Sequence, residues 1–176
     1  MRVLLASQEA SASALLGDAG RAQNALRDAR DAASGVTTDS GLSTWSCPRP
    51  RQALYALSVA LRLRDADGAL RAADTADAGW ASGDPWLYGV WSLIRIGSGI
   101  AHVIKGDLDA AAGQLSAVVT LEPPFRISTI TGYLADMDSL LRQRRFAGSA
   151  QAPDLREQIR VFTAGASPAV APEGDH

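Results

Sequence analysis

A short turn followed by an alanine-rich helical pattern recurs three times in this chain, and no other feature constrains its fold as strongly. The turns read GDAG at 17–20, RDAD at 64–67 and GDLD at 106–109. After each turn, small or aliphatic residues recur at spacings of four and three, which places them on one face of a helix. These residues are Ala22, Leu26 and Ala29, then Ala69, Ala73 and Ala76, then Ala111, Leu115 and Val118. Such a face lets a second helix approach closely, so each unit predicts two packed helices.

The first helix of each pair is visible upstream of the second and third turns. Residues 51–64 read RQALYALSVALRLR, and residues 84–105 read DPWLYGVWSLIRIGSGIAHVIK. The second of these segments is apolar around most of its circumference, which predicts a central buried helix over about residues 85–105. Its polar stripe consists of Ser92, Arg95, Ser98 or Gly99, and His102. We expect Gly99 to lie at a contact with a neighbouring helix.

The third unit resembles the tetratricopeptide pattern, in which a glycine stands in the first helix, an alanine opens the second and a proline closes it. Gly99 and Pro123 each lie twelve residues from Ala111, whereas the first unit has Ala10 and Ser34 at those places. The turns are 47 and 42 residues apart, which exceeds the tetratricopeptide repeat of about 34, so longer connections are expected. We therefore predict an all-α fold, a right-handed stack of antiparallel helix pairs forming a tetratricopeptide-like α-solenoid of about eight helices.

The ends of the repeated region define the expected domain, residues 1–164. Residues 34–50, SGVTTDSGLSTWSCPRP, have no helical period and predict a loop insertion, in which Trp45 either packs back onto the helices or anchors a partner. Residues 165–176 predict a disordered tail. Between these segments, a helix after the third unit is predicted from apolar residues on one face: Ile127, Ile130, Leu134, Met137 and Leu141. A last helix is predicted to begin near Pro153.

Composition excludes several classes of protein. The 17 basic and 19 acidic residues give a formal charge of −2, so no overall field attracts nucleic acid or a membrane. Gln8 and Glu9 interrupt the apolar N-terminal run before a signal peptide or a membrane span could form. The single cysteine, Cys47, excludes an intramolecular disulfide and agrees with a reducing compartment. We expect a cytoplasmic protein that binds neither nucleic acid nor membrane.

The residue types needed for catalysis are scarce. His102 and His176 are the two histidines, too few to build a zinc site with Cys47, and Lys105 follows no glycine-rich phosphate loop. Nothing in the sequence brings Cys47 and His102 together as nucleophile and base. The turn aspartates Asp18, Asp65 and Asp107 are explained as caps of the helices that follow them. The sequence predicts no enzyme, no metal site and no cofactor.

Several segments together resemble a known family of regulators. They are LLGD at 15–18, GDPW at 83–86, KGDLDAAAGQLSAVVTLEPPFRI at 105–127 and RQRRFAGSAQAPDLREQI at 142–159. In this order they are similar to the C-terminal tetratricopeptide-like region of actinobacterial transcriptional regulators with an XRE-type helix-turn-helix domain, over about residues 3–164. The resemblance implies a sensory and dimerising module that binds a peptide, protein or small ligand. It also implies a truncated or stand-alone sensory half, without the DNA-binding domain.

A DNA-reading role for the helix near residues 127–145 is disfavoured. Such a helix needs a supporting helix before it, but Pro123 and Pro124 stand there instead. Arg142, Arg144 and Arg145 are interpreted as a solvated helix end that complements the helix dipole.

A polar stripe on the segment at 51–64 is the first candidate site. Arg51, Tyr55, Ser58 and Arg62 recur at spacings of four, three and four, opposite Leu54, Leu57 and Leu61. Together with Arg95 and His102, this stripe is predicted to line a partner groove on the concave face of the stack. Arginine suits a carboxylate, so the expected partner is an acidic or C-terminal peptide segment of a protein, with a homodimer as another outcome. An ordinary solvated face explains the same stripe equally well.

An aromatic cluster is the alternative site. Trp80, Trp86, Tyr88 and Trp91 could line an apolar pocket between helix pairs and make the chain a sensor of small molecules. Hydrophobic core is the competing interpretation, because Trp86 and Trp91 belong to the mostly apolar segment.

Overall fold

The computed structural model describes residues 1–34 and 47–165, which exclude Trp45, most of the predicted insertion and most of the predicted tail. Within these ranges the chain forms eight α-helices, two 3-10 turns and no strand, which confirms the all-α prediction. The α-helices are α1 (Arg2–Leu15), α2 (Ala19–Ser34), α3 (Arg49–Arg62), α4 (Ala66–Ala81), α5 (Tyr88–Lys105), α6 (Leu108–Val118), α7 (Ser128–Leu141) and α8 (Gln151–Ala164). The 3-10 turns are η1 (Pro123–Phe125) and η2 (Arg144–Phe146). None of these helices is long and apolar enough to cross a membrane.

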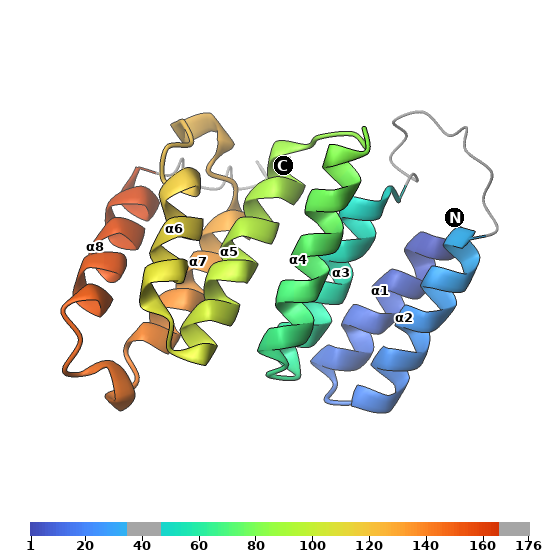
Figure 1. The fold of residues 1–176 in the computed structure, drawn as a ribbon, viewed down its shortest axis with the longest axis horizontal. Helices are drawn as coiled ribbons and strands as arrows, with labels where there is room; N and C mark the ends of the chain where they lie inside the picture. The colour runs from blue at the N-terminus through green and yellow to red at the C-terminus, as the bar shows by residue number, and fades with distance from the viewer. Residues whose placement is uncertain (35–46, 166–176) are drawn as a thin grey trace, which may run out of the picture.

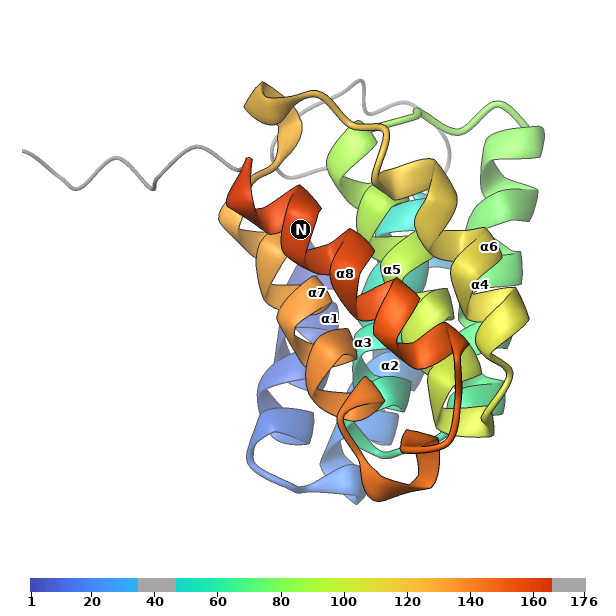
Figure 2. The same ribbon diagram turned by 90° about the vertical axis from the view of Figure 1, so that its left-hand side faces the viewer.

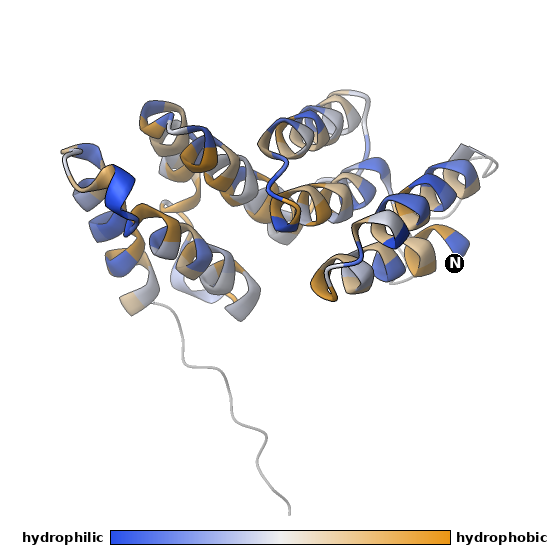
Figure 3. Cartoon of the chain, turned by 90° about the horizontal axis from the view of Figure 1, so that it is seen from below, coloured by the Kyte–Doolittle hydropathy of each residue, from blue (hydrophilic) through white to orange (hydrophobic). Residues whose placement is uncertain are grey.

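The helices lie in consecutive pairs along the long axis of the molecule (Figure 1). Helices α1 and α2, α3 and α4, and α5 and α6 pack tightly against each other, and α7 packs on both α5 and α8. The odd-numbered helices also contact one another in the order α1, α3, α5, α7, whereas α2 and α4 make little direct contact. In Figure 2, α1 and α7 lie along one edge and α4 and α6 along the other. Seen from below, the pairs follow an arc (Figure 3).

The three repeated turns share a capping geometry. The side chains of Asp18, Asp65 and Asp107 each accept a hydrogen bond from the backbone N–H three residues later, at 2.9, 2.8 and 3.0 Å. These carboxylates satisfy N–H groups that the helix itself leaves without acceptors, as predicted. The residue before each aspartate has a positive φ: 79° at Gly17, 60° at Arg64 and 85° at Gly106.

The side chains of the core become smaller toward the N-terminus. Residues of α5 to α8 form a core of large side chains, and α3 to α5 form a second one made mostly of alanine. The buried residues that the first pair contributes to a third cluster are alanines, Ala10, Ala14, Ala22 and Ala25. Val59 of α3 completes the cluster, and the partly buried Leu26 and Leu63 pack against it. The first helix pair therefore buries less apolar surface than the last two pairs do.

Helix α5 is central and largely buried, as the sequence indicates, but it differs in two details. It begins at Tyr88 rather than near residue 85, because Leu87 has an extended backbone. Its polar stripe does not face solvent: Ser92 and Ser98 are buried, and Ser92 Oγ donates to the Tyr88 carbonyl at 2.7 Å. A serine in a helix can bury its hydroxyl by bonding to the preceding turn, which a stripe of polar letters does not reveal.

The final pair also departs from its predicted boundaries. Helix α7 ends at Leu141, and Ile127 is the exposed residue before its first turn rather than part of its buried face. Asp138 on α7 joins the two helices: Arg142 Nε donates to Asp138 Oδ2 at 2.8 Å, and Arg156 Nε of α8 donates to Oδ1 at 2.9 Å. Burial acts to raise the pKa of Asp138, but these hydrogen bonds outweigh it and hold the pKa below its ordinary value.

Candidate functional site

A hollow of about 480 Å³ opens on the face formed by α1, α3, α5 and α7. We call it the groove. Its lining is Ala14, Ser58, Leu61, Arg62, Arg64, Ile100, Ile104, Tyr133, Asp136, Ser139, Leu140 and Gln143. Ser58 and Arg62 of the predicted polar stripe therefore line it, together with residues of α5 and α7 that the sequence did not single out. Arg51 and Tyr55 are half-buried and lie outside this lining.

The groove combines apolar and polar parts. Leu61, Ile100 and Ile104 supply apolar surface between α3 and α5. Ser58 Oγ and Tyr133 Oη form a hydrogen bond that ties α3 to α7. Burial raises the pKa of the Tyr133 phenol, while the hydrogen bond with Ser58 acts in the opposite direction. Tyr133 is therefore a neutral hydroxyl that can donate and accept hydrogen bonds at physiological pH.

Charged residues are also part of the groove lining. Arg62 and Arg64 contribute two positive charges, and Asp136 contributes one negative charge. Arg64 takes a left-handed backbone conformation, with φ of 60°, where the first and third turns have glycine. A bulky residue in this region is strained by about 1 kcal/mol or more, and such strain is found preferentially at functional sites.

Arg95 and His102 lie elsewhere. The Arg95 guanidinium pairs with Asp77 of α4, and its Nη1 donates to Gln114 Oε1 of α6 at 3.3 Å. His102 Nδ1 lies 3.9 Å from an Asp107 carboxylate oxygen, at the turn into α6. Both side chains are thus directed toward the even-numbered helices, because α5 packs between the two rows. The structure does not bring them to the groove.

None of the four aromatic residues of the alternative site lines the groove. Trp86 is 58% exposed, and its ring centroid lies 6.0 Å from that of Trp91. Tyr88 makes an edge-on contact of 4.9 Å with Phe125 of η1. Trp91 and Tyr88 pack against the large core and Trp80 against the second core. These contacts agree with the core interpretation, except at the exposed Trp86.

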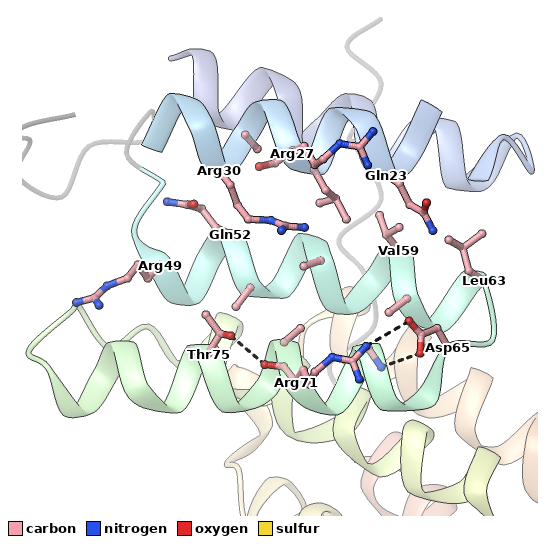
Figure 4. Close-up of a pocket in the computed structure, with 18 residues that line it drawn as sticks. Gln23, Arg27, Arg30, Arg49, Gln52, Val59, Leu63, Asp65, Arg71 and Thr75 are labelled. Carbon is pink, nitrogen blue, oxygen red and sulfur yellow. Dashed lines mark hydrogen bonds and ion pairs between the residues drawn. The ribbon is translucent and has the colours of Figure 1, made fainter. Parts of the chain in front are cut away.

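A second hollow, of about 560 Å³, lies between α2 and α4 with α3 as its floor (Figure 4). We call it the cleft. Four arginines line it: Arg27 and Arg30 of α2, Arg49 of α3 and Arg71 of α4. Sequence reasoning missed this site. On α2, Arg27 and Arg30 are spaced to share one face, but the cationic partners on α3 and α4 are far apart in the sequence.

The candidate catalytic groups remain separate. Cys47 is half-buried before α3, burial raises the pKa of its thiol, and Arg51 and Ser7 are its polar neighbours. His102 has Asp107 as its acidic neighbour, so the structure does not pair it with Cys47. Among the described residues, no three His, Cys, Asp or Glu side chains gather to hold a metal ion.

No protein-family model, curated protein or solved structure matches this chain.

Proposed function

We propose that this chain is a non-catalytic, tetratricopeptide-like helical-repeat module whose groove binds a peptide segment of a partner protein. The observation that carries the proposal is the construction of the groove: four helices, α1, α3, α5 and α7, each contribute to one hollow. Stacked helix pairs create extended surfaces of this kind, on which a peptide can contact several repeats at once. The resemblance to the sensory half of a transcriptional regulator agrees with such a role.

The apolar part of the groove suits a hydrophobic side chain of the peptide. Leu61, Ile104 and Tyr133 are only partly buried, so an apolar group placed on them would remove more of their surface from water. Removing apolar area from water contributes about 25 cal/mol per Å². The polar groups at Ser58, Tyr133 and Gln143 can orient a peptide backbone beside that contact.

The charges of the groove favour a carboxylate on the ligand. Arg62 and Arg64 outnumber Asp136, and a guanidinium forms two parallel hydrogen bonds with a carboxylate. The strained backbone of Arg64 agrees with a functional use of its side chain. We therefore propose a segment with an aliphatic side chain next to an acidic residue or a free C-terminus, from another protein or from a second copy of this chain.

A displayed library of peptides with free C-termini tests this proposal. Enriched peptides are synthesised and titrated by fluorescence anisotropy against the wild type, the double variant Arg62→Gln, Arg64→Asn, and the control Arg144→Gln on η2. We choose asparagine at position 64 because it tolerates a positive φ. We expect enrichment of peptides with an aliphatic residue next to a carboxylate. The double variant should weaken their binding about tenfold and reduce its salt dependence, with little effect of the control.

Two results would contradict the proposal. One is the absence of any enriched peptide that binds in solution. The other is a set of peptides that bind the wild type and the double variant with equal affinity, which would place the binding surface outside the groove.

A further inference from the structure

The cleft between α2 and α4 has a composition that differs from that of the groove, and it lies on the other side of α3. We propose that it is a binding site for a small polyanion that carries several phosphate or carboxylate groups. Arg27, Arg30, Arg49 and Arg71 line it from three helices, and Figure 4 shows Arg30 extending between α2 and α3 while Arg49 points outward at one end of the cleft. The site is independent of the peptide groove proposed above.

The acidic residues of α2 do not neutralise this cluster. Asp28 and Asp31 follow Arg27 and Arg30 directly in the sequence, but neither aspartate lines the cleft. A step of one residue turns a helix by about 100°, so the two arginines share a face from which the two aspartates are displaced. Among the residues that the structure describes, Asp65 is the one acidic residue in the lining of the cleft.

The existing ion pairs leave the cleft with an excess of positive charge. Arg49 Nε lies 2.9 Å from Asp84 Oδ2, and Arg71 Nη2 lies 3.8 Å from Asp65 Oδ2. The Asp65 carboxylate is already used, because its Oδ1 accepts the capping hydrogen bond from Gly68 N. On α2, the Arg27 guanidinium contacts the Asn24 amide oxygen, which carries no charge. In the described part of the chain no acidic side chain pairs with Arg30.

The shape of the cleft selects a small ligand rather than a helix. Its floor consists of short side chains that are already buried, including Ala53, Val59 and Ala60 of α3 and Ala72 of α4. A helical ligand would need contact with these floor residues, which are already covered. A compact anion needs contact only with the guanidinium groups. The volume of about 560 Å³ falls within the range of small-molecule sites.

Binding in the cleft would join the first two helix pairs. Helices α2 and α4 make little direct contact, and an anion held by Arg30 on one side and Arg71 on the other bridges them. A ligand that binds the folded state raises its stability according to the ligand concentration. We therefore expect a polyanion to raise the melting temperature of the full chain.

Isothermal titration with tripolyphosphate and with citrate, at constant ionic strength, tests the proposal. The variant Arg27→Gln, Arg30→Gln removes two charges from the cleft, and Arg2→Gln, Arg144→Gln removes two charges from exposed positions outside both hollows as a matched control. We expect one saturable site for at least one probe, with affinity at least tenfold lower in the cleft variant and unchanged in the control. A preference for tripolyphosphate assigns phosphate as the recognised group, and a preference for citrate assigns carboxylate.

The folded state of both variants is checked by their melting temperatures without ligand. The proposal is overturned if neither probe shows saturable binding, if the cleft variant binds as the wild type does, or if both variants lose affinity equally. The last result would indicate a response to net charge alone. The peptide proposal is tested with the groove variant and the polyanion proposal with the cleft variant. Either proposal can therefore fail without affecting the other.

Discussion

Arg64 occupies a position at which the other two repeated turns have glycine. Its φ of 60° is close to those of Gly17 and Gly106, at 79° and 85°. A side chain in this conformation costs about 1 kcal/mol or more, which glycine avoids. We predict that Arg64→Gly raises the free energy of unfolding by about 0.5–1 kcal/mol, because the relief of strain exceeds the entropy that glycine adds to the unfolded chain. Urea denaturation measures this change.

The matched control is Gly106→Ala, which introduces the same strain into the third turn. A Cβ atom at Gly106 would meet no other atom within 4 Å, so backbone conformation alone determines the effect. We expect a loss of about 1 kcal/mol. Lower stability of Arg64→Gly would show that the Arg64 side chain stabilises the fold by more than its backbone strain costs.

For single residues, the sequence predicts interactions with nearby positions in the chain better than it predicts which neighbouring helix a side chain faces. The capping roles of Asp18, Asp65 and Asp107 could be predicted because a cap depends on residues three positions away. The placement of Arg95 could not be predicted, because helices pack on two sides of α5 and a polar residue of α5 can find partners on either side. Asp77 and Gln114, which bind Arg95, become its neighbours only in the folded chain.

Two glycines of α5 lie at helix contacts of different closeness. A Cβ atom at Gly97 would lie 2.3 Å from Leu57 Cδ2 of α3, whereas one at Gly99 would lie 3.5 Å or more from any neighbour. Leu57 is fully buried, so its side chain can give way to an added methyl group only by displacing other core residues. We predict that Gly97→Ala lowers the free energy of unfolding by about 1–3 kcal/mol through overpacking. Gly99→Ala should be neutral or slightly stabilising, because alanine favours the helix.

Thermal and urea unfolding of both variants compare these effects directly. Gly99→Leu should still destabilise by about 1–3 kcal/mol, because a longer side chain reaches Met137 and the backbone of Ala111. Equal stability of Gly97→Ala and Gly99→Ala would contradict the close contact between α3 and α5.

At the scale of elements, the positions of helices were more predictable than the spaces between them. Alanine periodicity and the turn aspartates predicted α2, α4 and α6, and apolar faces predicted α5 and α7. The first residue of α5 and the last of α7 were misplaced by a few positions. The cleft could not be predicted. It exists because α2 and α4 both rest on α3 without touching closely, and that separation depends on how successive pairs pack. Its arginines therefore look like ordinary residues of solvated helix faces in the sequence.

The whole molecule is expected to unfold unevenly, because its packing changes from one end to the other. Methyl groups of alanine remove less surface from water than the leucine, isoleucine and phenylalanine side chains of the C-terminal core. The first pair is also attached on one side only, chiefly through α1 and α3, and α2 makes little contact with α3. In such stacks each unit is stabilised by its own packing and by its immediate neighbours.

We predict that α1 and α2 open in a separate, lower-energy step. Amide hydrogen exchange followed by mass spectrometry should give residues 2–34 an opening free energy about 2 kcal/mol or more below that of residues 88–141. Val59→Ala should lower the protection of residues 2–34 further, because Val59 is the buried side chain that α3 contributes to the alanine cluster of the first pair. Val118→Ala, an equally buried valine in the C-terminal core, should leave residues 2–34 unchanged. Equal protection at both ends of the chain would instead mean that the pairs unfold as one cooperative unit.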